Sequence, residues 1–185
     1  MLVAAEELLR LGGADALTVE AVVERAGTST GSFYARFGNR RGLLVAMHER
    51  FLETLDATWR RAANDALAQS TLRDSLRLFL GAVFVAVRRH RDTLHFHMIH
   101  NAHDENMRSQ GNELTRGAFA LIVEIVGTHA KQESDVDLDK LDLVGRALFG
   151  LLLEIVLFDS HEVNGRHVAD EERAERFTDM VLAYL

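Results

Sequence analysis

Hydroxyl, aromatic and arginine side chains are gathered in one short segment near the start of this sequence. Residues 18–44 read TVEAVVERAGTSTGSFYARFGNRRGLL. The stretch 25–48 holds four arginines and no Asp or Glu, although the whole chain has a formal charge of −7. A short basic island with interleaved hydroxyl and aromatic groups is typical of a surface that contacts phosphates and base edges.

The residues around this island predict three short helices that would position it. Residues 2–11 form an amphipathic pattern that stops at a pair of glycines. Thr18 suits the N-cap of a second helix, and Gly27 suits its end because glycine readily takes a positive φ. A third helix is predicted over about 30–37, and Asn39 is a good cap for the next one. Two short helices joined by a glycine turn are the parts of a helix-turn-helix.

This segment resembles the DNA-binding domain of the TetR family of bacterial transcriptional regulators. The resemblance covers about residues 4–46, nearly the whole of that domain. It rests on Thr18, Val22, Ala26, Gly27, Ser29, Gly31, Phe33, Tyr34, Phe37, Asn39, Arg40, Leu43 and Leu44. It implies a three-helix DNA-binding domain over 1–46 and a helical ligand-binding and dimerisation domain over 47–185.

The resemblance and the chemistry of the side chains together predict a set of DNA contacts. Hydroxyls near helix starts and the long arms of a tyrosine and two arginines suit backbone phosphates. Thr30, Ser32 and Arg36 are the candidates for base edges in the major groove. Phe33 and Phe37 are expected to pack inward. The predicted DNA-binding set is Thr18, Thr28, Ser29, Thr30, Gly31, Ser32, Tyr34, Arg36, Arg40 and Arg41.

The rest of the sequence predicts further helices and no strands. Proline is absent, so nothing except glycine interrupts a helix. Apolar residues recur at three- and four-residue spacing over about 39–68, from Leu72 to Val87, and over about 92–108, 112–130, 139–159 and 170–185, and a break is expected near the polar end of 92–108. About nine helices are therefore expected, and the fold class is all-α.

A homodimer is expected, because one helix-turn-helix reads few base pairs and two can read a palindromic operator. The helix over 139–159 is apolar on nearly all sides and so needs cover from two directions. Together with the last helix it is the predicted interface, as in the TetR family. The candidates are Leu148, Leu151, Leu152, Ile155, Phe177, Val181 and Tyr184. The alternative is that these residues fill only the core of the monomer.

The remaining helices are expected to enclose a pocket for a small lipophilic or aromatic effector. The candidate lining residues are Trp59, Phe79, Val83, Phe96, His100, Phe119, Ile122 and Phe149. For any one of them, ordinary core packing is the alternative. Glu154 is the only charge in the apolar run 147–158. It would either pair with an arginine at the edge of its helix or recognise a polar group of the ligand.

The run HFHMIHNAHDENM suggests metal chemistry as an alternative function. His97, His100 and Asp104 would lie on one side of a helix, so a metal-responsive regulator could use the His-rich helix 95–104. Three ligands from a single helix rarely converge on one ion. We therefore expect no metal site and no cofactor.

Other classes of protein are disfavoured by what the sequence lacks. It has no cysteine, and it shows no nucleophile-elbow, phosphate-loop or paired-acid motif of an enzyme. No apolar run is long enough for a membrane span or fits a signal peptide. The sequence thus predicts a cytoplasmic, non-enzymatic regulator that binds double-stranded DNA as a homodimer. We expect a repressor that an effector releases from its operator.

Overall fold

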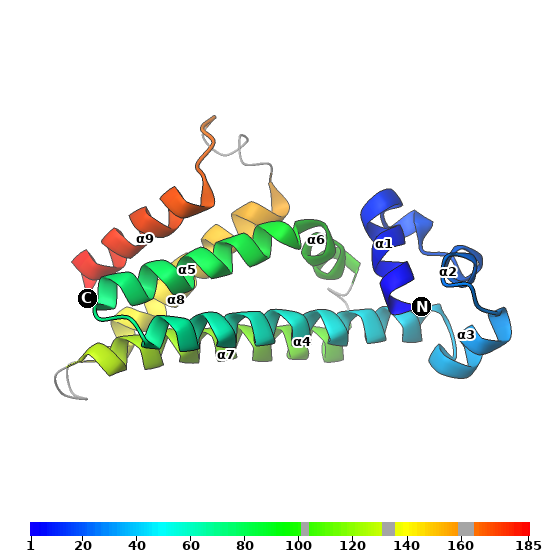
Figure 1. Cartoon of the computed structure of the whole chain (residues 1–185), viewed down its shortest axis with the longest axis horizontal. Helices are drawn as coiled ribbons and strands as arrows, with labels where there is room; N and C mark the ends of the chain where they lie inside the picture. Colours follow the sequence, from blue (N-terminus) through cyan, green and yellow to red (C-terminus); the bar gives the residue numbers. More distant parts are fainter. Residues whose placement is uncertain (101–103, 131–135, 159–164) are drawn as a thin grey trace. The chain divides into compact units, whose positions relative to one another are not determined.

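The computed structural model describes residues 1–100, 104–130, 136–158 and 165–185, with the backbone alone at His100. Within these ranges every regular element is helical and no strand occurs, which confirms the all-α fold (Figure 1). No helix among the described residues combines the length and the apolar character that crossing a bilayer requires.

The expected helices are present, with one boundary moved. They are α1 (Leu2–Gly12), the 3-10 helix η1 (Ala14–Ala16), α2 (Val19–Arg25), α3 (Thr30–Phe37), α4 (Arg40–Leu67), α5 (Leu72–Arg89), α6 (Arg91–His100), α7 (Glu105–His129), α8 (Leu138–Leu157) and α9 (Asp170–Tyr184). The break expected near the polar end of 92–108 is present, since α6 ends at His100, and the helix expected from about 112 begins earlier, at Glu105. The reason is a cap: Asp104 Oδ1 accepts the backbone N–H groups of Asn106 and Met107, each at 3.2 Å.

The described chain forms two compact units. One consists of Met1–Thr54 and Asp92–Gly111, and the other of Leu55–Arg91 and Asn112–Leu185. The first unit therefore extends beyond the expected domain 1–46 and includes nearly all of α6. The reason is Phe96, which is only 4% exposed and belongs to the same buried cluster as Ala5 and Leu9 of α1.

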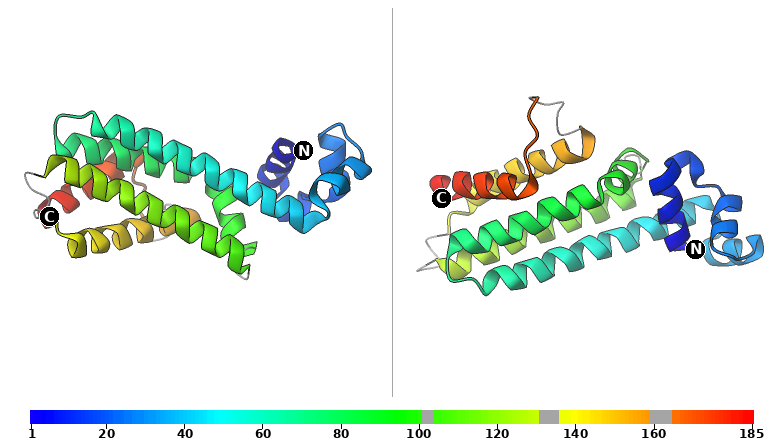
Figure 2. Two further views of the ribbon diagram at one scale, coloured as in Figure 1. Left: turned by 90° about the horizontal axis from the view of Figure 1, so that it is seen from below. Right: turned by 45° about the horizontal axis from the view of Figure 1, so that its top comes forward.

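The core of the first unit is a small cluster beneath the three N-terminal helices. Its buried members are Ala5, Leu9, Leu17, Val22, Phe33, Leu43, Met47 and Phe96. They come from α1, α2, α3, α4, α6 and the segment before α2, so each element contributes one or two anchors. Figure 2 shows the three short helices from two further sides. The cluster fixes the angles at which these helices meet.

The second unit packs α9 along α5, with α8 against the same helix. The large side chains Phe79, Leu80 and Phe84 of α5 are almost completely buried. The ring of Phe84 meets that of Phe177 on α9 edge to face, with centroids 6.5 Å apart. This apolar contact stabilises the packing of α9 on α5.

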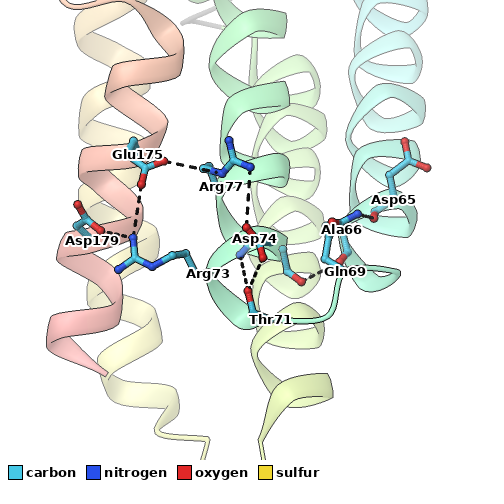
Figure 3. Close-up of polar contacts among 10 residues, drawn as sticks. Asp65, Ala66, Gln69, Thr71, Arg73, Asp74, Arg77, Glu175 and Asp179 are labelled. Carbon is cyan, nitrogen blue, oxygen red and sulfur yellow. Dashed lines mark hydrogen bonds and ion pairs between the residues drawn. The ribbon is translucent and has the colours of Figure 1, made fainter.

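Charged side chains border the same contact between α5 and α9 (Figure 3). Arg73 pairs with Asp179 and lies 3.5 Å from Glu175, and Arg77 Nε lies 3.8 Å from Glu175. Thr71 caps α5 by accepting the backbone N–H of Asp74 at 3.1 Å. The ion pairs are exposed and so contribute little to stability, but they favour one register of α9 along α5.

Candidate nucleic-acid interface

Local capping chemistry sets the bounds of the two helices that form the helix-turn-helix. Thr18 Oγ1 accepts the backbone N–H of Ala21 at 3.1 Å and begins α2. Gly27 then takes φ of 60°, a left-handed conformation that turns the chain between α2 and α3. Ser29 Oγ accepts the backbone N–H of Ser32 at 3.1 Å and begins α3. The short, tightly bounded helices follow from these residue types.

The polar side chains of α3 are exposed, while its Phe33 side chain is buried and anchors the helix. Phe33 is completely buried, and its ring lies 5.3 Å from that of Phe37, centroid to centroid. The inward packing of these two rings is confirmed for Phe33 and is partial for Phe37. The other residues of the helix are exposed, and they are Thr30, Gly31, Ser32, Tyr34, Ala35 and Arg36. One face of α3 is thus an uncovered polar surface on a rigid support.

Two long side chains of this surface, Tyr34 and Arg36, pack against phenylalanine rings. The ring of Tyr34 is 51% exposed and leans against Phe33, edge to face, with centroids 5.5 Å apart. The guanidinium carbon of Arg36 lies 5.4 Å from the centre of the Phe37 ring. These contacts restrain the two side chains, and both residues remain exposed at the surface. A hydroxyl and a cation are therefore presented from the same helix.

Arg40 has structural partners that the sequence did not reveal. Its Nε donates to the carbonyl of Leu17 at 2.8 Å, and its Nη2 donates to the carbonyl of Ala14 at 3.2 Å. The side chain therefore joins the first turn of α4 to the segment between α1 and α2. A guanidinium has five N–H groups, so donors remain for a phosphate. Arg40 is exposed on the same unit as α3.

Arg41 also has a partner within the first unit. Its Nη2 lies 2.6 Å from Asp104 Oδ2, and the hydrogen bond from Arg41 is the main cause that lowers the pKa of Asp104. The carboxylate thus caps α7 with one oxygen and holds Arg41 with the other. An Asp directly before the run that begins at Glu105 is an N-cap signal, but nothing in the sequence connects it to residue 41.

The remaining predicted DNA contacts lie at or near the starts of these helices. Thr18 and Ser29 are exposed N-caps, and Thr28 is half-buried in the turn. Asn39 accepts the backbone N–H of Gly42 at 2.9 Å through Oδ1 and so caps α4, as expected. The structure places all ten predicted residues in the first unit, on the helix-turn-helix or at the start of α4.

A histidine that the sequence interpretation passed over is buried in the first unit. His48 is 5% exposed, and its Nε2 lies 3.1 Å from the carbonyl of Met107. Its ring meets that of His97 with centroids 4.9 Å apart. In the described residues, no three His, Cys, Asp or Glu side chains are grouped to hold a metal. The side chain of His100, which the metal hypothesis invoked, lies outside the described residues.

Lowering the pH is expected to destabilise the first unit through His48. Burial lowers the pKa of His48 below 6.5, because the charged imidazolium loses its hydration. The unfolded state then binds more protons than the folded state as the pH falls through about 6.5, so the free energy of unfolding decreases. Urea titrations at several pH values should show this slope. His48→Phe should reduce it by up to about 1.4 kcal/mol per pH unit.

Met47→Leu is the matched control for this pH dependence, since it changes a buried apolar residue of the first unit at similar volume and removes no titratable group. The free energy of unfolding of this control should change with pH by the same slope as that of the unmodified protein. An equal slope for His48→Phe would contradict the role given to His48.

The residues predicted to line an effector pocket are divided between the two units. Trp59, Phe79, Val83 and Ile122 are buried in the second unit, and Phe119 is half-buried there. Phe96 is instead part of the core of the first unit. Phe149 is 46% exposed on α8, because it lies next to Leu148 and so faces another side of the helix. The side chain of His100 is not among those described.

The residues predicted for the dimer interface differ in exposure. Leu148, Ile155, Phe177 and Val181 are at most 6% exposed within the single chain, where α5, α8 and α9 pack together. Leu151 and Leu152 are half-buried, and Tyr184 is 42% exposed. Other large apolar side chains of α8 and α9 are exposed, namely Leu138, Leu143, Phe149, Leu157 and Met180.

Glu154 has an arginine partner, which confirms the first of its two interpretations. Arg173 Nη1 on α9 lies 3.4 Å from Glu154 Oε2 on α8. The side chain of Arg173 is 9% exposed and that of Glu154 is 24% exposed. The pair therefore joins α8 to α9 in a largely buried setting.

Comparison with known proteins points to the same part of the chain. The family described as bacterial regulatory proteins, tetR family, matches residues 1–47. No curated protein matches the sequence.

Solved structures share the fold over nearly the whole length. A TetR-family regulator, PfmR from Thermus thermophilus, has a TM-score of 0.67 and 21% identity, over 98% of this chain and 96% of that one. A putative TetR-family regulator from Mesorhizobium loti has a TM-score of 0.75 and 15% identity, over 100% and 92%. The regulator FadR from Bacillus subtilis, in complex with stearoyl-CoA, has a TM-score of 0.67 and 17% identity, over 100% and 97%. Residues 1–47 of this chain therefore match the TetR family of bacterial regulatory proteins, and the chain has the fold of solved TetR-family transcriptional regulators.

Proposed function

We propose that this chain is a ligand-responsive, DNA-binding transcriptional regulator of the bacterial cytoplasm, and not an enzyme. It acts as a repressor that binds a palindromic operator as a homodimer and leaves it when a small lipophilic or aromatic effector binds. The observation that carries the proposal is the exposed polar face of α3 on its completely buried Phe33.

The geometry of α3 suits the major groove. Ser32 and Thr30 at its first turn would reach base edges, while Tyr34 and Arg36 would extend to phosphates or to guanine. Gly31 lies on the same exposed face, so the backbone of α3 can approach the duplex closely. The remaining predicted DNA contacts would add phosphate contacts around this helix, and they are Thr18, Thr28, Ser29, Arg40 and Arg41.

The dimer is proposed to form through α8 and α9. The proposed interface includes Leu151, Leu152 and Tyr184, together with the exposed Phe149 and Met180. The buried residues would support this face from beneath, and they are Leu148, Ile155, Phe177 and Val181. Large exposed apolar side chains on two adjacent elements favour association with a second copy.

The proposed effector is lipophilic because the second unit encloses apolar and aromatic side chains. Four of the predicted lining residues are buried there and are proposed to contact the effector, namely Trp59, Phe79, Val83 and Ile122. One structure with the same fold is a regulator solved with stearoyl-CoA, which has a long apolar chain. Binding would favour a state that holds the two copies of α3 at another spacing, and DNA would be released in proportion to that preference.

Three variants of α3 test the DNA contacts once a duplex has been selected from a random pool. Tyr34→Phe removes only a hydroxyl and should weaken binding about tenfold if that group contacts a phosphate. Arg36→Gln should lower the salt dependence of log K by about one unit of slope for each copy in the dimer. Gly31→Ala should weaken binding without unfolding the protein, because its Cβ would lie 3.8 Å from Ser29 Oγ, an ordinary contact. Fluorescence anisotropy with labelled duplex measures all three.

Arg61→Gln is the matched control, since it removes an exposed cation from the second unit. Its affinity and salt slope should stay those of the unmodified protein. If the α3 variants bind the selected duplex as tightly as this control, the polar face of α3 is not the DNA surface and the proposal fails.

A further inference from the structure

A surface pocket of about 310 Å³ opens within the first unit, between the end of α1 and one face of α6. Leu9, Arg10 and Ala14 line it from the side of α1 and η1. His95, Phe96 and Ile99 line it from α6, where three- and four-residue spacing places them on one face. The volume lies at the lower end of the range of small-molecule sites.

The inner part of this pocket is apolar. Leu9 and Phe96 are each 4% exposed and belong to the core cluster of the first unit, so they form a firm base. Ile99 is 53% exposed and stands beside that base. A flat aromatic ring would cover these three side chains and remove their apolar surface from water.

Two oppositely charged side chains line the pocket, Arg10 and Asp92. Arg10 is exposed and makes no ion pair with any residue in the described ranges. Asp92 has an interaction partner, whereas no interaction of Arg10 within the described ranges is found. The positive charge of Arg10 is therefore available to a ligand. A guanidinium binds a carboxylate with two parallel hydrogen bonds, which makes a carboxylate its best partner.

We propose that this pocket binds a small aromatic carboxylate of about two fused rings. The carboxylate pairs with Arg10, and the ring system packs on Leu9, Phe96 and Ile99. The site lies in the first unit, whereas the effector residues retained above lie in the second. It is thus a second ligand site, placed beside the helix-turn-helix itself.

The wall of the pocket connects directly to a candidate DNA contact. Ala14 lines the pocket, and its carbonyl accepts the hydrogen bond from Arg40 Nη2 at 3.2 Å. A ligand that presses on Ala14 changes the position of that carbonyl and hence of the Arg40 guanidinium. This consequence for DNA affinity rests on the proposed function, but the binding of the carboxylate does not.

Calorimetry on the full chain, without DNA, tests the site with 2-naphthoate and with its neutral analogue 2-naphthamide. The naphthoate should bind, and the amide should bind at least about tenfold more weakly because it lacks the charge. Arg10→Gln should weaken the naphthoate by about the same factor, and Ile99→Trp should abolish its binding by filling the space. Leu11→Trp is the matched control, because Leu11 is 65% exposed on α1 and does not line the pocket.

Equal affinity of the naphthoate for the unmodified protein, Arg10→Gln and Ile99→Trp would place it elsewhere in the chain and overturn the proposal. So would a lack of binding at millimolar concentration. If Ile99→Trp lacks the circular dichroism of a folded helical protein, Arg10→Gln decides, since it changes only an exposed side chain. A DNA-binding assay with and without naphthoate then tests the coupling separately. If the protein binds naphthoate but no DNA, the proposed function is contradicted and the proposed carboxylate site is not.

Discussion

Replacing Gly42 with alanine is expected to destabilise the first unit by about 3 kcal/mol or more, the upper end of the effect of overpacking. A Cβ at this position would lie 1.9 Å from the carbonyl oxygen of Phe37 and 3.0 Å from its carbonyl carbon. Both are backbone atoms, so no side-chain rotation relieves the overlap. The last turn of α3 and the first turn of α4 would have to separate. Thermal unfolding followed by circular dichroism should show the loss.

Gly111→Ala is the matched control for this substitution. Gly111 lies in the helix α7 of the same unit, and nothing would lie within 4 Å of its Cβ. Alanine is favoured over glycine in a helix by about 1 kcal/mol, so this variant should be more stable than the unmodified protein. The two Gly→Ala changes should therefore have opposite signs. A stable Gly42→Ala variant would contradict the close contact between α3 and α4.

Replacing Glu154 with leucine is expected to lower the free energy of unfolding by about 3 kcal/mol, because it leaves a buried charge without its partner. Arg173 is buried, and its Nε is already without a hydrogen-bond partner among the described residues. Glu154 supplies the nearby negative charge at 3.4 Å. Without Glu154, the guanidinium of Arg173 is still removed from water but no longer has the attraction of a nearby carboxylate. Urea titration at a fixed protein concentration measures the change.

The double variant Glu154→Leu with Arg173→Leu should recover most of that loss, since it removes both charges. Glu113→Leu is the control, because it breaks an exposed pair with Arg116 and should change stability by less than about 0.5 kcal/mol. If the double variant is as unstable as Glu154→Leu alone, lost packing rather than the unpaired charge causes the effect.

Local structure could be predicted from the sequence because its causes are local. The caps at Thr18 and Asn39 and the left-handed turn at Gly27 depend on residues within three or four positions, and each is present as expected. The α-helices followed from apolar spacing and the absence of proline for the same reason. The break near the polar end of 92–108 is present, but the helix expected from about 112 begins at Glu105, because Asp104 could be recognised as a cap only once Glu105 was known to begin a helix.

Long-range partners could not be predicted in the same way. Arg41 and Asp104 are 63 positions apart, and Arg40 finds two backbone carbonyls that no side-chain pattern marks. The apolar surface of α8 posed a related problem. Since apolar residues surround that helix, spacing alone could not tell that Leu148 is buried and that its neighbour Phe149 is exposed. Tertiary packing decides both questions.

The place of Phe96 in the first unit has a practical consequence for protein engineering. This ring, from a helix far beyond the end of α3 in the sequence, fills the same core as Leu9 and Phe33. A chimera that joined residues 1–54 to a foreign sensor would carry a hole where that ring belongs. The first unit of this chain is therefore transplantable only as two separate segments, with the stretch 92–111 moved together with residues 1–54.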